Sequence, residues 1–205
     1  MTASVAAQLR GSDADWTSKN SNSTKFVTSG DMENTATAYF GSFYHFDRII
    51  LPSDAIVTKV TITVNQGSLT FSGKPFVVVH TENPADLANI DNVFNTVKTA
   101  RATALNSETA AEVVAGETKT TVLDNGRTES IELTGENIEK YFNAKAANSY
   151  FMYNKDTADT NKRPLKPDAR IEIEYRLPIY MCSVTSKGET VPYAKYESLG
   201  MERST

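Results

Sequence analysis

The sequence has few of the residues that staple folds or carry common catalytic chemistry. Its 205 residues include one cysteine, Cys182, and two histidines, His45 and His80. A single cysteine excludes an internal disulfide, so we expect a fold that holds without an oxidising compartment. No HExxH, GxSxG or phosphate-cradling glycine motif occurs, and no nucleophile, base and orienting group form a recognisable set. We therefore expect neither enzymatic activity nor a bound cofactor or metal.

Long apolar runs and a surplus of positive charge are also absent. No apolar stretch reaches the length of about 18 residues that a membrane-spanning helix needs. The first residues lack the basic segment and apolar run of a secretion signal, so we expect a protein made in a cytoplasm. Asp and Glu number 25 against 21 Lys and Arg, which leaves no basic surplus for phosphate groups. We expect neither nucleic acid nor membrane among the partners.

The histidines and two aspartate pairs are weak candidates for chemistry. Each histidine lies in a predicted strand beside aromatic residues or valines, which favours a tucked or interface residue over a catalytic base. Asp13 and Asp15 could hold a hard cation together with backbone carbonyls. The further oxygen ligands of a calcium loop are missing, so a solvated turn is favoured, and the same holds for Asp156 and Asp159.

Alternation with a period of two predicts the strands. The inward face of a strand over residues 56–65 consists of Ile56, Thr58, Val60, Ile62 and Val64. The inward face of a strand over residues 170–176 consists of Ile171, Ile173 and Tyr175. Such alternation is typical of half-buried strands. Turn signals such as Asp124-Asn125-Gly126, between two β-prone runs, extend the pattern.

Helical patterns are brief. We expect a helical turn near residues 86–92, followed by an insertion or a long hairpin, and a short helix within residues 135–145 that Thr134 caps. The sequence therefore predicts an all-β fold, an antiparallel β-sandwich with one short helix and extended N- and C-terminal segments. Long connections indicate crossovers between two sheets, which favours a jelly-roll-like topology.

Composition divides the chain into three parts. Residues 1–36 are rich in Ser, Thr, Asn and Asp and are predicted to form an N-terminal arm with one short strand over residues 25–28. Residues 37–176 are predicted to form the β-sandwich domain, and residues 177–205 a C-terminal extension for partner contacts. Trp16, the only tryptophan, either anchors the arm to its own domain or contacts a neighbouring chain.

An aromatic cluster opens the predicted sandwich. It consists of Tyr39, Phe40, Phe43, Tyr44 and Phe46. Exposed flat rings can form a sugar-binding platform, so a glycan is a candidate partner. Both faces of residues 43–49 are apolar, however, which is typical of a strand covered on both sides. We expect the sandwich core on one face, and the N-terminal arm or another subunit on the other.

The order of several short motifs resembles a known family. The motifs are Phe46-Asp47, Leu51-Pro52, Ala55-Ile56, residues 60–64, residues 134–143, residues 150–153, Arg163-Pro164-Leu165 and residues 171–175. Over roughly residues 37–176 this order resembles the DNRLRE-type domain, a jelly-roll module of secreted and surface proteins that has counterparts in phage structural proteins. The acidic-Asn-Arg motif behind the family name is absent, and residues 166–169 look like an insertion. The resemblance implies the fold more than a function.

The C-terminal extension carries the interaction hypothesis. Residues 177–205 are rich in Tyr, Met and aliphatic residues, which interfaces favour over disordered tails. The extension either folds back on its own domain or lies on a neighbouring protein. The predicted partner-binding residues are Trp16, Leu177, Ile179, Tyr180, Met181, Tyr193, Tyr196 and Leu199.

These features predict a non-enzymatic structural protein of a virus particle, namely a bacteriophage capsid-decoration, collar or tail component. Its partners would be other virion proteins and further copies of itself, and its location would be the virion after synthesis in the host cytoplasm. The alternative is a carbohydrate-binding module, which includes binding of a host glycan on the same particle. Exposed aromatic rings would favour sugar binding, and aromatics buried between chains would favour assembly.

Overall fold

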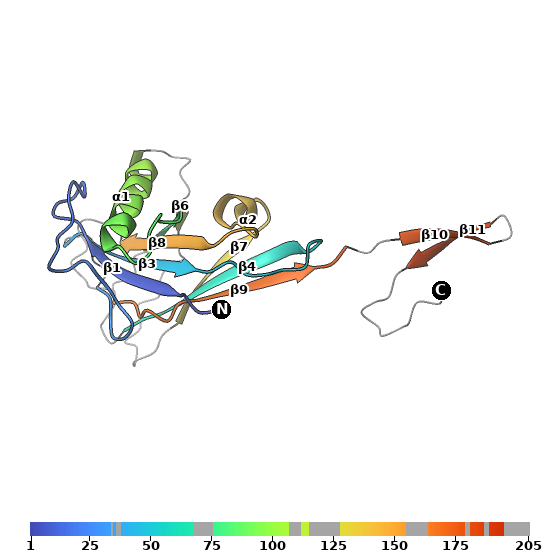
Figure 1. The fold of residues 1–205 in the computed structure, drawn as a ribbon, viewed down its shortest axis with the longest axis horizontal. Coiled ribbons are helices and arrows are strands. Elements are labelled where there is room, and N and C mark those ends of the chain that lie inside the picture. Colours follow the sequence, from blue (N-terminus) through green and yellow to red (C-terminus); the bar gives the residue numbers. More distant parts are fainter. Residues whose placement is uncertain are drawn as a thin grey trace.

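Two antiparallel β-sheets form the body of the molecule in a computed structural model (Figure 1). The structure describes residues 1–33, 35, 38–67, 76–106, 112–114, 128–154, 164–178, 181–186 and 189–194. The larger sheet has six strands in the order β2-β1-β3-β8-β5-β6, and the smaller has three in the order β7-β4-β9. The prediction of a sandwich-like all-β architecture is confirmed at this level.

The strands of the larger sheet are β1 (Val5–Arg10), β2 (Lys25–Phe26), β3 (Phe40–Phe46), β5 (Phe76–Thr81), β6 (Glu112–Val114) and β8 (Asn148–Asn154). Those of the smaller sheet are β4 (Ile56–Asn65), β7 (Thr128–Thr134) and β9 (Arg170–Arg176). Along the chain β3, β4, β5, β7, β8 and β9 belong to the two sheets in turn, apart from the short β6. The predicted crossovers between the sheets are therefore present.

The first hydrophobic core lies between the two sheets. Its members include Tyr44, Phe46, Val60, Ile62, Val64, Ile131, Leu133, Tyr150, Met152 and Ile171. The predicted alternation in β4 holds for its second half, where Val60, Ile62 and Val64 are buried. A β-bulge between Val57 and Lys59 breaks the alternation in the first half. As a result Val57 packs against the core and Ile56 is 42% exposed, so the predicted inward position of Ile56 is wrong.

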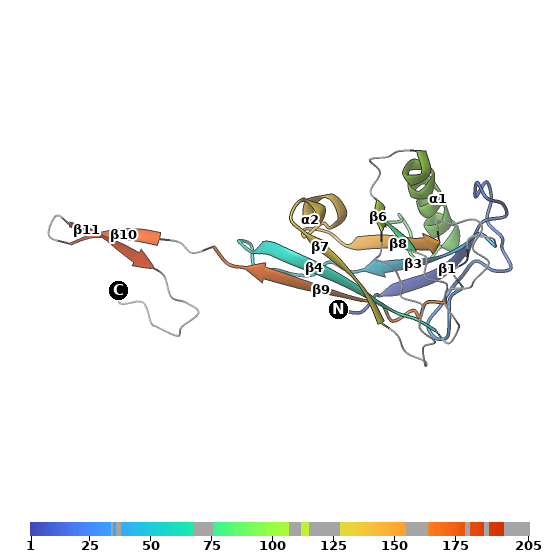
Figure 2. The same cartoon turned by 180° about the vertical axis from the view of Figure 1, so that it is seen from behind.

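A second core covers the opposite face of the larger sheet. It joins Ala7, Leu9, Phe43, Val77, Val79, Phe151 and Tyr153 of the sheet to Val93, Phe94 and Val97 of helix α1 (Ile90–Asn106) and to Trp16. Figures 1 and 2 show α1 lying against this sheet on the side away from β4 and β9. The prediction that residues 43–49 are covered on both sides is confirmed for residues 43–46, since every residue of β3 is buried, whereas Asp47 and Arg48 are exposed. The outer cover comes from the same chain.

The 17 residues of α1 correct the predicted helical content. The sequence predicts a turn near residues 86–92 and then an insertion or hairpin, and it predicts one short helix in all. The structure has the short helix α2 (Glu136–Tyr141) and also this longer one. The side chain of Asn89 caps α1 by accepting the backbone N–H of Asp91 at 2.9 Å. Burial of one face on the sheet outweighs the poor helix propensity of its Thr and Asn residues.

The predicted N-terminal arm is part of the sandwich. β1 pairs with β3 over six residues, and β2 forms the edge within the strand predicted for residues 25–28. The N-terminal amine of Met1 donates to the carbonyl of Ile171 at 2.8 Å, and the N–H of Ile171 donates to the carbonyl of Met1 at 2.8 Å. Ala6, Ala7 and Leu9 are buried, which ties this segment down despite its polar surroundings.

The C-terminal extension forms a hairpin of its own. Strands β10 (Met181–Ser186) and β11 (Glu189–Ala194) pair with each other and, among the described residues, with no strand of the two larger sheets. Figures 1 and 2 show this hairpin standing beyond the end of β9. Within the described part of the chain, β9 is thus the last strand that belongs to either of the two larger sheets.

Candidate interaction surface

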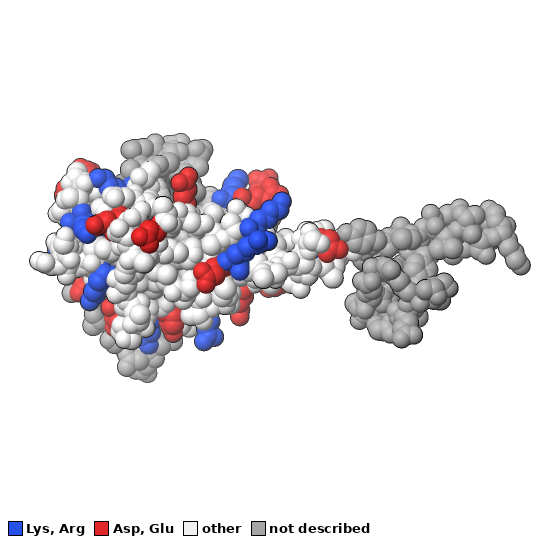
Figure 3. Space-filling model, viewed as in Figure 1, with Lys and Arg blue, Asp and Glu red and all other residues white. Residues whose placement is uncertain are grey.

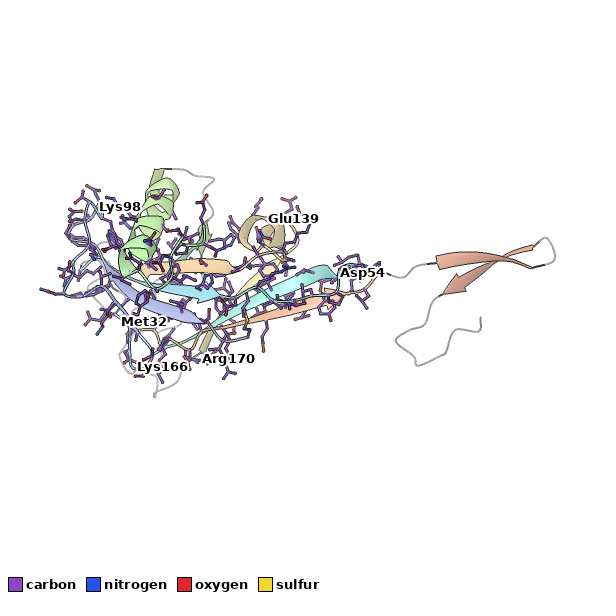
Figure 4. The ribbon with its side chains drawn as sticks, in the orientation of Figure 1. Met32, Asp54, Lys98, Glu139, Lys166 and Arg170 are labelled. Atoms are coloured by element: carbon purple, nitrogen blue, oxygen red, sulfur yellow. The ribbon has the colours of Figure 1, made fainter. Side chains whose placement is uncertain are left out.

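Exposed apolar side chains gather where the C-terminal extension leaves the sandwich. Leu177 is 53% exposed and follows directly after β9, whose Tyr175 is 44% exposed. Across the ladder, Val57 of β4 pairs with Tyr175 and Ile56 with Arg176. Ile50 in the β3–β4 connection is 88% exposed, and Figure 4 labels Asp54 of the same connection at this end of the molecule. We call Ile50, Ile56, Tyr175 and Leu177 at this end of the sandwich the root patch. Tyr175 and Leu177 share one face of the smaller sheet, and Ile56, opposite Arg176, lies on the other face.

The root patch exists because β4 and β9 extend beyond the larger sheet. Ile171 and Ile173 share a strand face with Tyr175, and Ile171 is buried while Ile173 is half-buried. Exposure thus rises along β9 toward the extension. The sequence predicts that Tyr175 faces inward. Tyr175 does share its face with Ile171 and Ile173, but its side chain is exposed and not buried. The residue alternation gives the face of a strand but not the point at which the opposite sheet ends.

Charges of both signs lie on the smaller sheet near the root patch. Lys59 of β4 lies 2.6 Å from a carboxylate oxygen of Glu132 and 3.7 Å from one of Glu174. The hydrogen bond to Glu132 is the main reason that the pKa of Lys59 is raised above its usual value. In the face shown by Figure 3, acidic and basic side chains are interspersed. Such a surface is compatible with specific pairing between proteins, in which charges of opposite sign meet.

Apart from Trp16, the predicted partner-binding residues fall into three groups. Leu177 is exposed at the root patch. Met181 and Tyr193 lie in the hairpin, where they pair with Ala194 and Cys182. Ile179, Tyr180, Tyr196 and Leu199 lie outside the described residues. Ile50 and Ile56 were not among the predicted partner-binding residues. The sequence signal for this surface is the apolar alternation of β9, which continues to Leu177.

Trp16 requires a correction. It is 2% exposed, and its ring stacks on that of Phe94 with centroids 5.4 Å apart. The rings of Trp16 and Phe151 pack in a T-shaped arrangement with centroids 5.3 Å apart, and the Arg101 guanidinium lies 5.4 Å from the Trp16 ring centre. Its side chain is used inside its own chain, so the prediction that it binds a partner is wrong. The alternative, a peg that anchors the N-terminal segment, is the one that fits.

His45 belongs to a buried polar network. Nδ1 of His45 lies 2.8 Å from Oγ of Ser149, which in turn donates to Oδ1 of Asn83 at 2.8 Å. Nε2 of His45 lies 3.7 Å from Asp47. Ser149 is fully buried and its hydroxyl proton is used by Asn83, so this series of contacts lacks an accessible nucleophile. It joins β3, β8 and the segment that follows β5.

A polar pocket of about 350 Å³ adjoins this network. It is lined by His80, Thr81, Glu82, Asn83, Asn143 and Ala147. The amide of Asn83 donates to the carbonyl of Ala147 at 2.9 Å, and the ring of His80 lies 5.1 Å from that of Tyr150. These contacts hold the pocket wall together. They do not align a base with a nucleophile.

The free energy of unfolding is expected to fall as the pH drops from about 7.5 to about 5.5, in part through these histidines. Burial lowers the pKa of His45 and of His80 below the usual 6.5. Above 6.5 both rings are neutral in the folded and unfolded chain; below it the unfolded chain binds protons first, so stability is lost. Urea unfolding at a series of pH values measures this loss.

Carboxylates add their own pH dependence, so a matched variant is needed. His80→Gln is expected to show a smaller loss of stability over the same pH interval than the wild type. Equal losses in both proteins would mean that His80 titrates alike in the folded and unfolded chain, contrary to the burial that the structure shows.

The aromatic cluster offers no ring platform to a glycan. Phe40, Phe43, Tyr44 and Phe46 are all buried, and Tyr39 is half-buried against the second core. A separate groove of about 600 Å³ runs along the N-terminal edge. Its walls are Thr2, Ala3, Ser4, Val5, Ala6, Phe26, Val27, Thr28, Leu87, Ala88, Pro167 and Asp168. The single aromatic ring in this lining is that of Phe26.

Asp13 organises the loop that carries Trp16. Its carboxylate accepts the backbone N–H groups of Asp15 and Thr17, each at 3.1 Å, and the hydroxyls of Ser12 and Thr17. The hydrogen bond from the Thr17 side chain is the main cause of its lowered pKa. Asp13 therefore acts as the acceptor of a turn. Asp156 and Asp159 lie outside the described residues.

Within the described ranges, no group of three or more His, Cys, Asp or Glu side chains is placed to hold a metal ion. None of the helices in that part of the chain has the length and apolar character needed to cross a membrane. No model of a known protein family matches the sequence, and no curated protein matches it. The resemblance to the DNRLRE-type domain stays a prediction.

Proposed function

We propose that the protein is a non-enzymatic structural component of a bacteriophage particle, acting through protein–protein assembly. The observation that supports this most directly is the β10–β11 hairpin, which follows the root patch and, among the described strands, pairs with neither sheet of the sandwich. A two-stranded hairpin alone is marginally stable in water, so it gains by packing on another surface. The sandwich supplies a rigid body and the extension supplies the contact.

The assignment to a phage particle rests on two further points. The order of motifs resembles a module type that is found in phage structural proteins, and the single cysteine fits a protein that folds in a cytoplasm. The repeated crossing between two sheets is compatible with the jelly-roll connectivity that we propose for the sandwich. The proposed location is the virion, and the proposed partners are other virion proteins and further copies of the chain.

A chain shortened to residues 1–178 is expected to fold normally and to be lost from the particle. The sandwich closes at β9, so the melting temperature should stay within about 4 °C of the full chain, the equivalent of about 1 kcal/mol at this size. Circular dichroism measures the melting, and quantitative mass spectrometry of purified particles measures incorporation. A shortened chain that aggregates would place the extension inside the sandwich.

The matched control is the full chain, which should be found in purified particles at a fixed ratio to the other virion proteins. Its absence from particles, with the protein recovered in the soluble fraction of infected cells, would contradict the proposal. The buried aromatic cluster removes the observation that favoured sugar binding, so no second function is proposed.

A further inference from the structure

One edge of the smaller sheet is open along the second half of β9. β9 is the terminal strand of the order β7-β4-β9. At its start the edge is closed, since Ile171 exchanges two hydrogen bonds with Met1. From Ile173 onward no strand of the described chain lies beyond it, and Figures 1 and 2 show β9 as the border of the sheet there. Open edges of this kind pair readily with another strand.

The hydrogen-bonding direction of β9 is fixed by its neighbours. Ile171 directs its N–H and C=O away from β4, toward Met1. The carbonyl of Glu174 accepts from Oγ1 of Thr58 and so points toward β4. Because these directions alternate along a strand, Ile173, Tyr175 and Leu177 present their backbone groups to the open edge. A partner strand must supply its own groups at matching positions.

We propose that β9 pairs with β9 of a second copy of this chain, antiparallel and around a two-fold axis at Tyr175. This inference deepens the assembly role, on which it rests, by naming one partner. In this register Tyr175 faces its own symmetry mate, and Ile173 faces Leu177 of the second copy. All of these residues present backbone groups to the open edge. Each of the two Ile173–Leu177 pairs forms two hydrogen bonds between the copies, and the Tyr175 pair at the axis forms two more.

Side chains on both faces match in this register. On the core-side face, Ile173, Tyr175 and Leu177 of one copy meet the same residues of the other, and Tyr175 and Leu177 are exposed members of the root patch. On the outer face, Glu174 lies opposite Arg176 of the second copy, and the symmetry repeats this pair. Directly opposed unlike charges stabilise a strand pair. Pro178 has no N–H, and the ladder ends there.

The neighbouring symmetric register is disfavoured by charge. An axis at Glu174 also satisfies the backbone, but it places the two Glu174 side chains directly opposite each other, which destabilises the pair. An axis at Ile173 would require Tyr175 to pair with Ile171, whose backbone groups Met1 already occupies. The register centred on Tyr175 is the one in which each exposed group of the edge finds a complement.

Charge reversal tests the inference on the full chain. The wild type is expected to sediment as a dimer, and Glu174→Arg or Arg176→Glu to weaken the dimer by about tenfold or more, because two pairs become repulsive. The double variant Glu174→Arg/Arg176→Glu restores both pairs and should dimerise like the wild type. A wild type that stays monomeric throughout the concentration range, or a double variant no better than the singles, would overturn the proposal.

A cysteine cross-link tests the register. Facing residues of a hydrogen-bonded pair have Cα atoms about 5.5 Å apart, which suits a disulfide. Tyr175→Cys in a Cys182→Ser background should form a covalent dimer under mild oxidation. Glu172→Cys in the same background should not, since the two positions would lie about 20 Å apart. Cross-linking at Glu172→Cys, or at neither position, would refute this register.

The outcome is separable from that of the proposed function. The chain of residues 1–178 keeps the whole edge and should still dimerise, whether or not it enters particles. If the protein forms this dimer but is never found in a particle, the β9–β9 interface is supported and the proposed function is rejected. If a chain that stays monomeric is incorporated into particles, the proposed function is supported and the β9–β9 interface is rejected.

Discussion

Ile62→Asp is expected to abolish cooperative folding. Ile62 is fully buried in the middle of β4, and its two cross-strand neighbours are Ile131 of β7 and Ile171 of β9. A carboxylate at this position would lose its hydration without gaining a partner among these isoleucines. The cost is several kcal/mol or more, against a total stability of about 5–15 kcal/mol for a domain. Circular dichroism melting and solubility measure the effect.

The matched control is Thr63→Asp on the opposite face of the same strand. Thr63 is half-buried, pairs with Ser130 and Arg170, and has its hydroxyl 3.3 Å from that of Ser130. A carboxylate there stays near water and near a positive charge, so the variant should fold. A soluble Ile62→Asp protein with a cooperative melting transition would show that β4 is not the central strand of the core.

Strands could be predicted from the sequence where one face of the strand is buried and the other is exposed to solvent. The second half of β4 and the start of β9 alternate in sequence as they do in the structure, because each packs on the same core through every second residue. The bulge after Val57 leaves no mark in the pattern, since Val57 and Ile56 are both apolar and either could face inward. Register and bulges are decided by the partner strand, which the local sequence does not contain.

The parts that cover the outer face of the larger sheet were not predictable from local patterns. The apolar positions of α1 have helical spacing, but its Thr and Asn residues favour loops in isolation. Residues 5–9 are a short stretch with four apolar residues within a polar segment, and they form a strand by pairing with β3. The short helix α2 was predicted, but Thr134 ends β7 and Gly135, at φ 56°, precedes the helix in its place.

The exposure of Leu177 could be anticipated from the sequence, whereas the open edge of β9 could not. The apolar composition after residue 176 pointed to Leu177, which is exposed at the root patch. The open edge of β9 depends on which strands pair, and Met1 closes the beginning of that edge from the far end of the chain. A contact over 170 positions has no local sequence signal. Trp16 was predicted to bind a partner for a related reason: Phe94 and Phe151, against which its ring packs, are distant from it in sequence.

Trp16→Ala is expected to destabilise the protein by about 3–5 kcal/mol, the usual cost of deleting a buried aromatic side chain. Trp16 stacks on Phe94 of α1 and meets the edge of Phe151 in β8, so its loss separates the helix from the sheet that it covers. For a chain of this size the melting temperature should drop by roughly 6–20 °C. Because Trp16 is the only tryptophan, circular dichroism rather than fluorescence has to follow the transition.

Gly11 supplies an independent control for the same contact. A Cβ at this position would lie 2.7 Å from two atoms of the indole, so Gly11→Ala should displace the ring and also destabilise the protein. In the Trp16→Ala background the same change meets no ring and should cost clearly less, which a double-mutant cycle measures as coupling. Additive effects, or a Trp16→Ala protein that melts like the wild type, would place the indole outside the core and return it to the candidates for partner binding.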